Sequence, residues 1–189
     1  EIYADGLTVF TTRADTLMGV TYVAVAAEHP MALKAAESND ALKAFIEECR
    51  MGSVAEADLA TAEKKGMATG LSVKHPVTGE DIPVWIANYV LMSYGSGAVM
   101  AVPAHDERDH AFATKFGIDI IQVIGSKEEI NIQVESYDAK YGKLMNSENF
   151  DRLSVKEGAA AIIQLAEERG FGTRKVNFKL RDAGYSRQR

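Results

Sequence analysis

Short runs of β-branched and aromatic residues alternate along this chain with stretches whose apolar residues recur at helical spacing, and this alternation limits what it can fold into. Such runs favour strands, and the helical spacing favours helices that bury one face. Strands interleaved with helices predict an α/β domain with a curved sheet or β-barrel-like core and surrounding helices. We expect strands at residues 7–12, 21–27, 71–74, 82–91 and 98–102.

Three stretches carry the start signals of helices, a polar N-cap residue before apolar residues on one face, and two of them also have a glycine just past the end. Ser154 and Glu157 have the spacing of a capping box. The segment 118–148 alternates short strand and turn signals and predicts no clear order of elements. The predicted helices follow Ser38-Asn39-Asp40, span 106–116 before Gly117, and run from Ser154 to Gly170.

The composition predicts one soluble domain. With 189 residues, 47% of them hydrophobic, the chain can bury a single sizeable core, so we expect one domain over 1–189. Its lone cysteine, Cys49, excludes an internal disulfide framework and suits a reducing cytosol. No apolar run approaches the roughly 18 to 20 residues that span a bilayer, and the first residues lack the positive start of a signal peptide. We therefore expect a cytoplasmic protein with no membrane attachment.

The net charge of −6 argues against a domain that coats nucleic acid over many phosphates, although it permits contact with one RNA end. Cations nevertheless crowd the last sixteen residues, where a solvated face is the usual interpretation. They are Arg174, Lys175, Lys179, Arg181, Arg187 and Arg189.

The turn Gly95-Ser96-Gly97 invites comparison with phosphate-binding loops. However, Met100 stands where a third glycine is needed, and no Gly-Lys-Ser/Thr follows. We predict a tight turn in which glycine supplies unusual backbone angles.

The run from His105 to His110 is the densest cluster of ionisable residues that suggests a site. A metal site formed by His105, Asp106, Asp109 and His110 is one hypothesis, because helical spacing puts the last three on one face. Against it, the order His-Glu-x-x-His is missing and Arg108 stands among the acids. Asp106 as N-cap and Asp109 as an acid of the first turn explain the same residues as a helix start. Spacing alone leaves the two interpretations equal.

The run from Thr11 to Thr16 places three hydroxyls, a cation and a carboxylate at the end of a predicted strand, where loops often carry binding groups. A solvent-exposed turn explains it slightly better on residue chemistry alone. No Gly-x-Ser-x-Gly elbow exists, and Cys49 lies on a predicted apolar helix face. If the chain is a hydrolase, we therefore expect water to be the nucleophile.

Residues 11–22 (TTRADTLMGVTY) and 94–109 (YGSGAVMAVPAHDERD) together resemble the two signature segments of leucyl-tRNA synthetase editing domains. Residues 28–30, 75–80, 179–182 and 186–189 are similar as well, so the resemblance covers nearly the whole chain. One departure is Ala14, where family members usually carry proline, which implies a less rigid loop.

The resemblance implies the family's α/β fold and post-transfer editing: hydrolysis of the aminoacyl ester of leucine tRNA that carries isoleucine, norvaline or a similar noncognate amino acid. The implied partners are the 3′ end of that tRNA and the catalytic core of the same synthetase, to which both ends of the chain lead back as strands. Motifs of the His-Ile-Gly-His and Lys-Met-Ser-Lys-Ser type are missing, so ATP and Mg belong to a synthetic core outside this chain. Editing itself would need no cofactor, and we expect a monomer.

The resemblance also implies roles for single residues. Asp109 would hold the α-ammonium of the substrate, while Thr11 and Thr12 would bind the substrate and position water or the developing oxyanion. Thr16 would crowd the side-chain pocket and exclude leucine. The further implied substrate contacts or supports are Arg13, Tyr94, Met100, Val102, His105 and Asp106.

Two rival functions remain from the residues alone. One is a metal-dependent hydrolase that uses the cluster from His105 to His110. The other is a non-catalytic module that docks tRNA through Arg187 and Arg189 of the basic tail.

Overall fold

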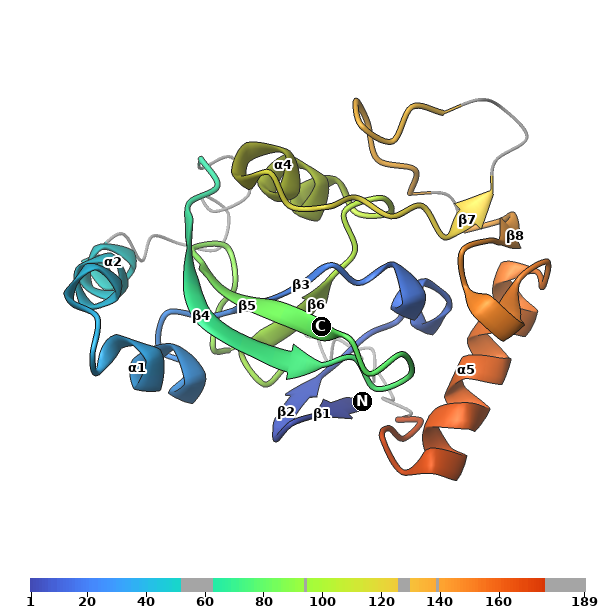
Figure 1. Ribbon diagram of the computed structural model, residues 1–189, viewed down its shortest axis with the longest axis horizontal. Helices are drawn as coiled ribbons and strands as arrows, with labels where there is room; N and C mark the ends of the chain where they lie inside the picture. The colour runs from blue at the N-terminus through green and yellow to red at the C-terminus, as the bar shows by residue number, and fades with distance from the viewer. Residues whose placement is uncertain (52–62, 94, 126–129, 139, 176–189) are drawn as a thin grey trace, which may run out of the picture.

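The computed structural model describes residues 1–51, 63–93, 95–125, 130–138 and 140–175. In these residues, strands and helices alternate as the sequence predicts, and Figure 1 shows their arrangement. In chain order the elements are β1 Ile2–Ala4, β2 Leu7–Val9, the 3-10 helix η1 Ala14–Gly19, β3 Tyr22–Val25, α1 Pro30–Ala36, α2 Asp40–Met51, β4 Gly66–Lys74, β5 Asp81–Ala87, β6 Ala98–Ala101, α4 Glu107–Phe116, β7 Ile124–Gly125, β8 Lys143–Leu144, η2 Glu148–Phe150 and α5 Val155–Arg169.

The central sheet has four strands in the order β4-β5-β3-β6. β3 runs parallel to β5 and antiparallel to β6, and β4 is antiparallel to β5. Two further sheets, β1-β2 and β7-β8, have two strands each. The α/β class is confirmed, but the described strands form open sheets, and a β-barrel-like core is not formed. Four strands are too few to close around a core of side chains.

Strand β3 is buried along its whole length, because both faces of the central sheet are covered. Tyr22 and Ala24 point to the face on which α4 packs through Phe112. Val23 and Val25 point to the opposite face and join the larger core, which includes residues of the β1-β2 hairpin, α2 and α5. This alternation follows from the period of two along a strand, and Figure 1 shows α4 and the hairpin on opposite sides of the sheet.

The helix ends match the sequence signals. The side chain of Asp106 caps α4 by accepting hydrogen bonds from the backbone N–H groups of Arg108 and Asp109. Ser154 and Glu157 form the predicted capping box of α5. Both helices end at a glycine in the left-handed conformation, Gly117 at φ 67° and Gly170 at φ 72°.

The start of the chain lies beside the segment that follows α5. The backbone N–H of Tyr3 donates to the carbonyl oxygen of Phe171 at 2.7 Å, and that of Thr173 donates to the carbonyl oxygen of Glu1 at 3.0 Å. Lys179, Arg181, Arg187 and Arg189 of the predicted basic tail lie outside the described residues. None of the helices in the described part of the chain is long and apolar enough to span a membrane.

Substituting Gly66 with alanine should destabilise the protein by about 2 kcal/mol, the usual cost of overpacking a core. A Cβ at Gly66 would overlap the buried ring of Phe112 and lie 2.9 Å from the carbonyl oxygen of Ile86. Gly125→Ala is the matched control, because its Cβ would meet the carbonyl oxygen of Lys143 at an ordinary 3.5 Å. Urea unfolding of both variants tests this, and equal stability of the two would contradict the close packing of α4 on β4.

Candidate functional site

The antiparallel pairing of β3 with β6 brings the two segments singled out in the sequence together. Tyr22, at the start of β3, pairs with Ala101, at the end of β6. The loop of residues 11–16 and η1 lead into β3, and the segment 102–109 follows β6. The loop with three threonines and the start of α4 therefore lie at the same edge of the sheet.

This threonine loop, residues 11–16, is held by its own hydroxyls. The Oγ1 atom of Thr11 accepts a hydrogen bond from the backbone N–H of Arg13 at 2.9 Å, and the Oγ1 atom of Thr16 donates to the carbonyl oxygen of Arg13 at 3.0 Å. Thr16 is buried, whereas Thr12 is exposed to solvent. The fixed position of Thr16 suits a residue that shapes a pocket, and the exposure of Thr12 leaves its hydroxyl accessible to a ligand.

An ion pair within the loop neutralises a buried acid. Asp15 is only 2% exposed, and the guanidinium of Arg13 contacts it through Nε at 3.2 Å and Nη2 at 2.9 Å. The Nη1 atom of Arg13 also lies 3.4 Å from a carboxylate oxygen of Asp138. Because a buried carboxylate needs a partner of this kind, one role of Arg13 is to stabilise the loop.

The turn of Gly95 and Gly97 is tight, as predicted, with φ of 61° and 74°. The Ser96 hydroxyl donates a hydrogen bond to the carbonyl oxygen of Thr8, and a Cβ at Gly95 would lie 2.8 Å from the ring of Phe10. The turn thus packs against the strand end that leads into the threonine loop. Tyr94, the predicted substrate contact beside this turn, lies outside the described residues.

Asp109 points inward from the first turn of α4. Its Oδ2 atom accepts a hydrogen bond from the backbone N–H of Val102 at 2.9 Å, and its Oδ1 atom accepts one from the Tyr89 hydroxyl at 3.3 Å. Burial first, and then the nearby charge of Asp106, raise the pKa of Asp109 to about 7 against the opposing effects of Val102, Arg108 and Tyr89. Carboxyl groups that titrate near neutrality gather at functional sites.

His105 is buried and uses both ring nitrogens. Its Nε2 atom accepts hydrogen bonds from the backbone N–H groups of Val123 at 3.0 Å and Ile124 at 3.2 Å. The ring proton is therefore on Nδ1, which donates to the carbonyl oxygen of Tyr137 at 2.7 Å. Burial lowers the pKa of His105, so the ring stays neutral. Its hydrogen bonds connect residues 123–124 with Tyr137, two parts of the segment 118–148 for which the sequence predicts no clear order of elements.

The metal site proposed from His105, Asp106, Asp109 and His110 is not formed. Across the described residues, no three His, Cys, Asp or Glu side chains are placed to hold a metal ion. The nitrogens of His105 are engaged, the Nε2 atom of His110 bonds the carbonyl oxygen of Ile132 at 2.8 Å, and Asp106 caps α4. Of the two interpretations of this run, the helix start is the one that the structure adopts.

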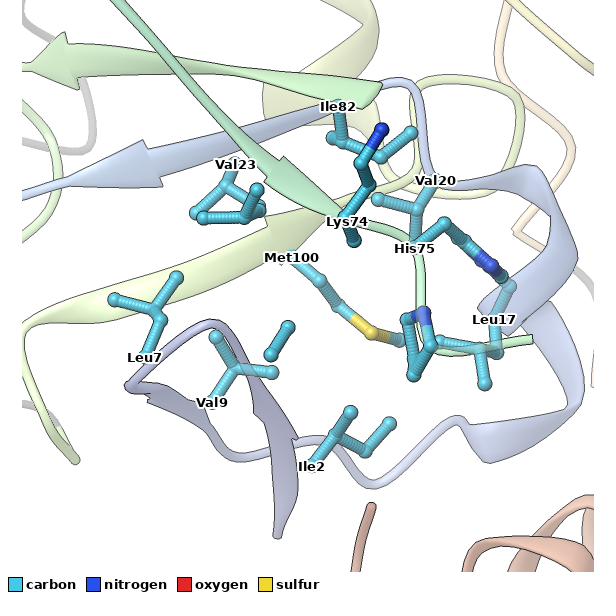
Figure 2. Close-up of a pocket in the computed structure, with 13 residues that line it drawn as sticks. Ile2, Leu7, Val9, Leu17, Val20, Val23, Lys74, His75, Ile82 and Met100 are labelled. Carbon is cyan, nitrogen blue, oxygen red and sulfur yellow. The ribbon is translucent and has the colours of Figure 1, made fainter. Parts of the chain in front are cut away.

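Met100 and Val102 occupy different surroundings. Met100 lines an apolar cavity between the β1-β2 hairpin, η1 and the sheet, and Figure 2 shows its side chain among those of Val9, Leu17 and Val23. Val102 is buried in the larger core and contacts Asp109 through its backbone N–H. Their predicted contact with a substrate stays a prediction.

Comparison with known proteins decides the family. The family model described as "Leucyl-tRNA synthetase, editing domain" matches residues 2–167. The chain belongs to this editing-domain family.

The relatives of this editing domain are much longer proteins. It is 69% identical over 195 residues to the Leucine--tRNA ligase of Acinetobacter baylyi (strain ATCC 33305 / BD413 / ADP1), covering 100% of the chain and 22% of that protein. It is 59% identical over 187 residues to the Leucine--tRNA ligase of Thiobacillus denitrificans (strain ATCC 25259 / T1), covering 97% and 22%. The chain thus spans about a fifth of the length of these curated relatives.

Among solved structures, the editing domain is similar to the crystal structure of the ternary complex of Agrobacterium radiobacter K84 agnB2 LeuRS-tRNA-LeuAMS. The TM-score is 0.64 at 27% identity, and the match covers 91% of this chain and 19% of that one. The fold described above is therefore the fold of the family's editing domain.

The sequence did not indicate three partners of the candidate site. Tyr89 lies inside the predicted strand 82–91, but β5 ends at Ala87 and Tyr89 falls in the turn that follows. Tyr22 is a core residue whose hydroxyl lies 3.0 Å from that of Tyr89, and Asp138 belongs to the segment without a predicted order. No local pattern in a single sequence marks such contacts between distant segments.

Asp109→Asn should make the editing domain more stable at pH 8. The pKa of Asp109 is about 7 in the folded chain and about 3.9 in an unfolded one. Folding therefore takes up a proton between these values, and the cost of burying the charge is complete only above pH 7. Asparagine avoids that cost, since its Oδ1 can accept from the backbone N–H of Val102 while its NH2 group donates to the Tyr89 hydroxyl. We therefore expect a gain on the order of 2 to 4 kcal/mol at pH 8 that disappears by about pH 4.

Urea unfolding at a series of pH values measures this difference. The exposed Asp119 provides the matched control, because Asp119→Asn removes a charge without relieving any burial. An Asp109→Asn variant no more stable than the parent at pH 8 would show that the carboxylate is not held in a buried, charge-disfavouring site.

Proposed function

We propose that this editing domain hydrolyses the ester bond between a noncognate amino acid and the 3′ end of leucine tRNA. The observation that carries the proposal is the buried Asp109 carboxylate at the start of α4, at the same sheet edge as the threonine loop. Membership of the editing-domain family supports it, as does the structural similarity to the LeuRS-tRNA-LeuAMS ternary complex. Isoleucine and norvaline are the expected amino acids, since a hydrophobic pocket separates such near-isosteres of leucine by only about 1 to 3 kcal/mol per methylene.

In this proposal Asp109 binds the α-ammonium of the amino acid through a charge-assisted hydrogen bond. Thr11 and Thr12 hydrogen-bond the ester and position the attacking water or the developing oxyanion. Water attacks the ester carbonyl, the bond to the ribose oxygen breaks, and the products are the free amino acid and the tRNA with its hydroxyl restored. We assign catalysis to positioning of these groups and assign no side chain as general base.

The remaining predicted residues support the reactive ones. Arg13 stabilises the loop through Asp15, and a direct contact with the ester or a phosphate stays a prediction. His105 fastens the segment around Tyr137, and Asp106 holds the first turn of α4. We expect editing to need no cofactor, and assign ATP and Mg to the synthetic core of the ligase.

We further propose that this domain acts within a monomeric, cytoplasmic leucine tRNA ligase and works beside its catalytic core. The chain covers 22% of the length of the Acinetobacter baylyi ligase to which it is similar, which supports a domain within a longer host protein. The alternative role, a tRNA-docking module that relies on Arg187 and Arg189, is an outcome of the following test.

The proposal is tested by measuring deacylation of leucine tRNA that carries either isoleucine or leucine. We expect the chain to cleave the isoleucyl ester selectively and equally well with a chelator. Asp109→Ala should lower the rate about 100-fold, a loss of nearly 3 kcal/mol of transition-state binding. Asp119→Ala, at an exposed position, is the control and should retain activity.

Loss of activity on chelation would instead indicate a metal-dependent hydrolase. If the isolated chain is inactive, it should be tested in place of the corresponding segment of the Acinetobacter baylyi ligase, its relative at 69% identity. Failure to cleave either ester in that host as well would favour the docking module.

Thr16→Ala should allow the domain to hydrolyse leucyl-tRNA. Thr16 is 3% exposed and fixed by its bond to Arg13, so alanine opens space where the side chain of leucine would lie. Thr16→Val preserves the bulk without the hydroxyl and should still spare leucine if exclusion is steric. The half-life of leucyl-tRNA with each variant measures this, with the exposed Thr114→Ala as control. An unchanged half-life with Thr16→Ala would disprove the assignment.

A further inference from the structure

We propose that Tyr89, supported by Tyr22, is a positioning residue that keeps the Asp109 carboxylate oriented and charged for an ammonium group. The inference rests on the proposed function for its consequence in editing. Its structural basis, the coupling of two tyrosine hydroxyls to one buried carboxylate, can be measured without any substrate.

The two hydroxyls form a short chain that ends on Asp109. The Tyr89 hydroxyl lies 3.3 Å from Oδ1 of Asp109 and 3.0 Å from the Tyr22 hydroxyl. The Tyr22 hydroxyl also lies 3.4 Å from the backbone carbonyl oxygen of Asp109. A charged carboxylate can only accept, so Tyr89 donates to it, and Tyr22 donates either to Tyr89 or to that carbonyl.

Packing on α4 fixes where the hydroxyls lie. The ring of Tyr22 stacks on Phe112 with centroids 5.2 Å apart, and the ring of Tyr89 meets the same Phe112 edge-on at 5.6 Å. Phe112 is fully buried and lies one turn of α4 beyond Asp109. The helix that carries the carboxylate therefore also positions its donors.

The hydrogen bonds leave the carboxylate able to bind a cation. The backbone N–H of Val102 occupies one acceptor position of Oδ2, and Tyr89 occupies one of Oδ1. Each carboxylate oxygen can accept a second bond. An ammonium group can therefore bind without displacing either donor. Both donors are uncharged, so neither cancels the negative charge that attracts the ammonium.

Several groups around Asp109 have opposing effects on its charge. Burial and the charge of Asp106 favour the neutral form of Asp109, whereas Val102, Arg108 and Tyr89 favour the charged form. The ammonium of Lys64 lies 5.8 Å from the ring centre of Tyr89. Burial raises the pKa of both Tyr22 and Tyr89, so their protons stay in place wherever Asp109 titrates. The hydrogen bond from Tyr89 is thus available throughout that range.

The test compares Tyr89→Phe with the parent chain by carbon-13 NMR titration of the Asp109 carboxyl group. Phenylalanine preserves the ring contact and removes only the donor. The pKa of Asp109 should rise by about one unit, as expected for loss of a hydrogen bond to a charged group. Tyr22→Phe should raise it less, and Tyr3→Phe, whose hydroxyl contacts Glu1 and Thr173, should leave it unchanged.

The pH profile of isoleucyl-tRNA hydrolysis supplies the functional readout. A higher pKa of Asp109 means that less of the enzyme is charged at low pH, so the acidic limb for Tyr89→Phe should move to higher pH by the same amount. The loss should appear mainly in KM and shrink as the pH rises through the pKa of Asp109. A uniform loss at every pH would indicate a merely structural role and overturn the proposal, as would an unchanged pKa of Asp109.

The two arms separate this inference from the proposed function. If the parent chain hydrolyses no ester but Tyr89→Phe still raises the pKa of Asp109, the proposed editing function is wrong. The role of the two tyrosines in substrate binding is then wrong as well, but the coupling of their hydroxyls to Asp109 is confirmed. If the parent edits and neither variant changes the pKa, only the positioning role fails. Should Tyr89→Phe not fold, Tyr22→Phe decides the same questions through its smaller shift.

Discussion

The antiparallel register of β3 and β6 is the constraint on which the candidate site depends. Because Tyr22 pairs with Ala101, the chain that enters β3 and the chain that leaves β6 meet at one edge of the sheet. The threonine loop belongs to the segment that enters β3, and Asp109 belongs to the segment that follows β6. A shift of one residue in this register would send Tyr22 to the opposite face, away from Phe112, and would break the chain of hydroxyls that ends on the carboxylate.

The residues that pack the core therefore also position the candidate site. Phe112 packs against Tyr22 and Tyr89 and leaves so little room that a glycine is required at position 66. That packing sets the position of α4, and the cap by Asp106 sets its first turn. The orientation of Asp109 follows from both, since its two oxygens meet donors from the end of β6 and from the turn after β5.

Features coded within a few residues could be predicted, and features that join distant segments could not. The caps at Asp106 and Ser154, the tight turn of Gly95 and Gly97 and the α/β class all follow from local propensity and spacing. The sequence left a metal site and a helix start equally open for residues 105–110, because a local pattern does not show that His105 would bond Val123 and Tyr137. The open sheet and the contact of Tyr89 with Asp109 likewise depend on pairings that one sequence does not display.

The location of Asp109 shows a conflict between stability and binding that the fold resolves only in part. Burying a carboxylate costs free energy, and complete compensation by cationic partners would leave no charge for a ligand to recognise. Here the compensation comes first from the backbone N–H of Val102, and then from the nearby charge of Arg108 and from the Tyr89 hydroxyl. Asp15 represents the opposite arrangement, because the guanidinium of Arg13 contacts both of its oxygens. Of these two buried acids, Asp109 is thus the one that retains net charge to offer an ammonium group, and its pKa near neutrality is the cost of that availability.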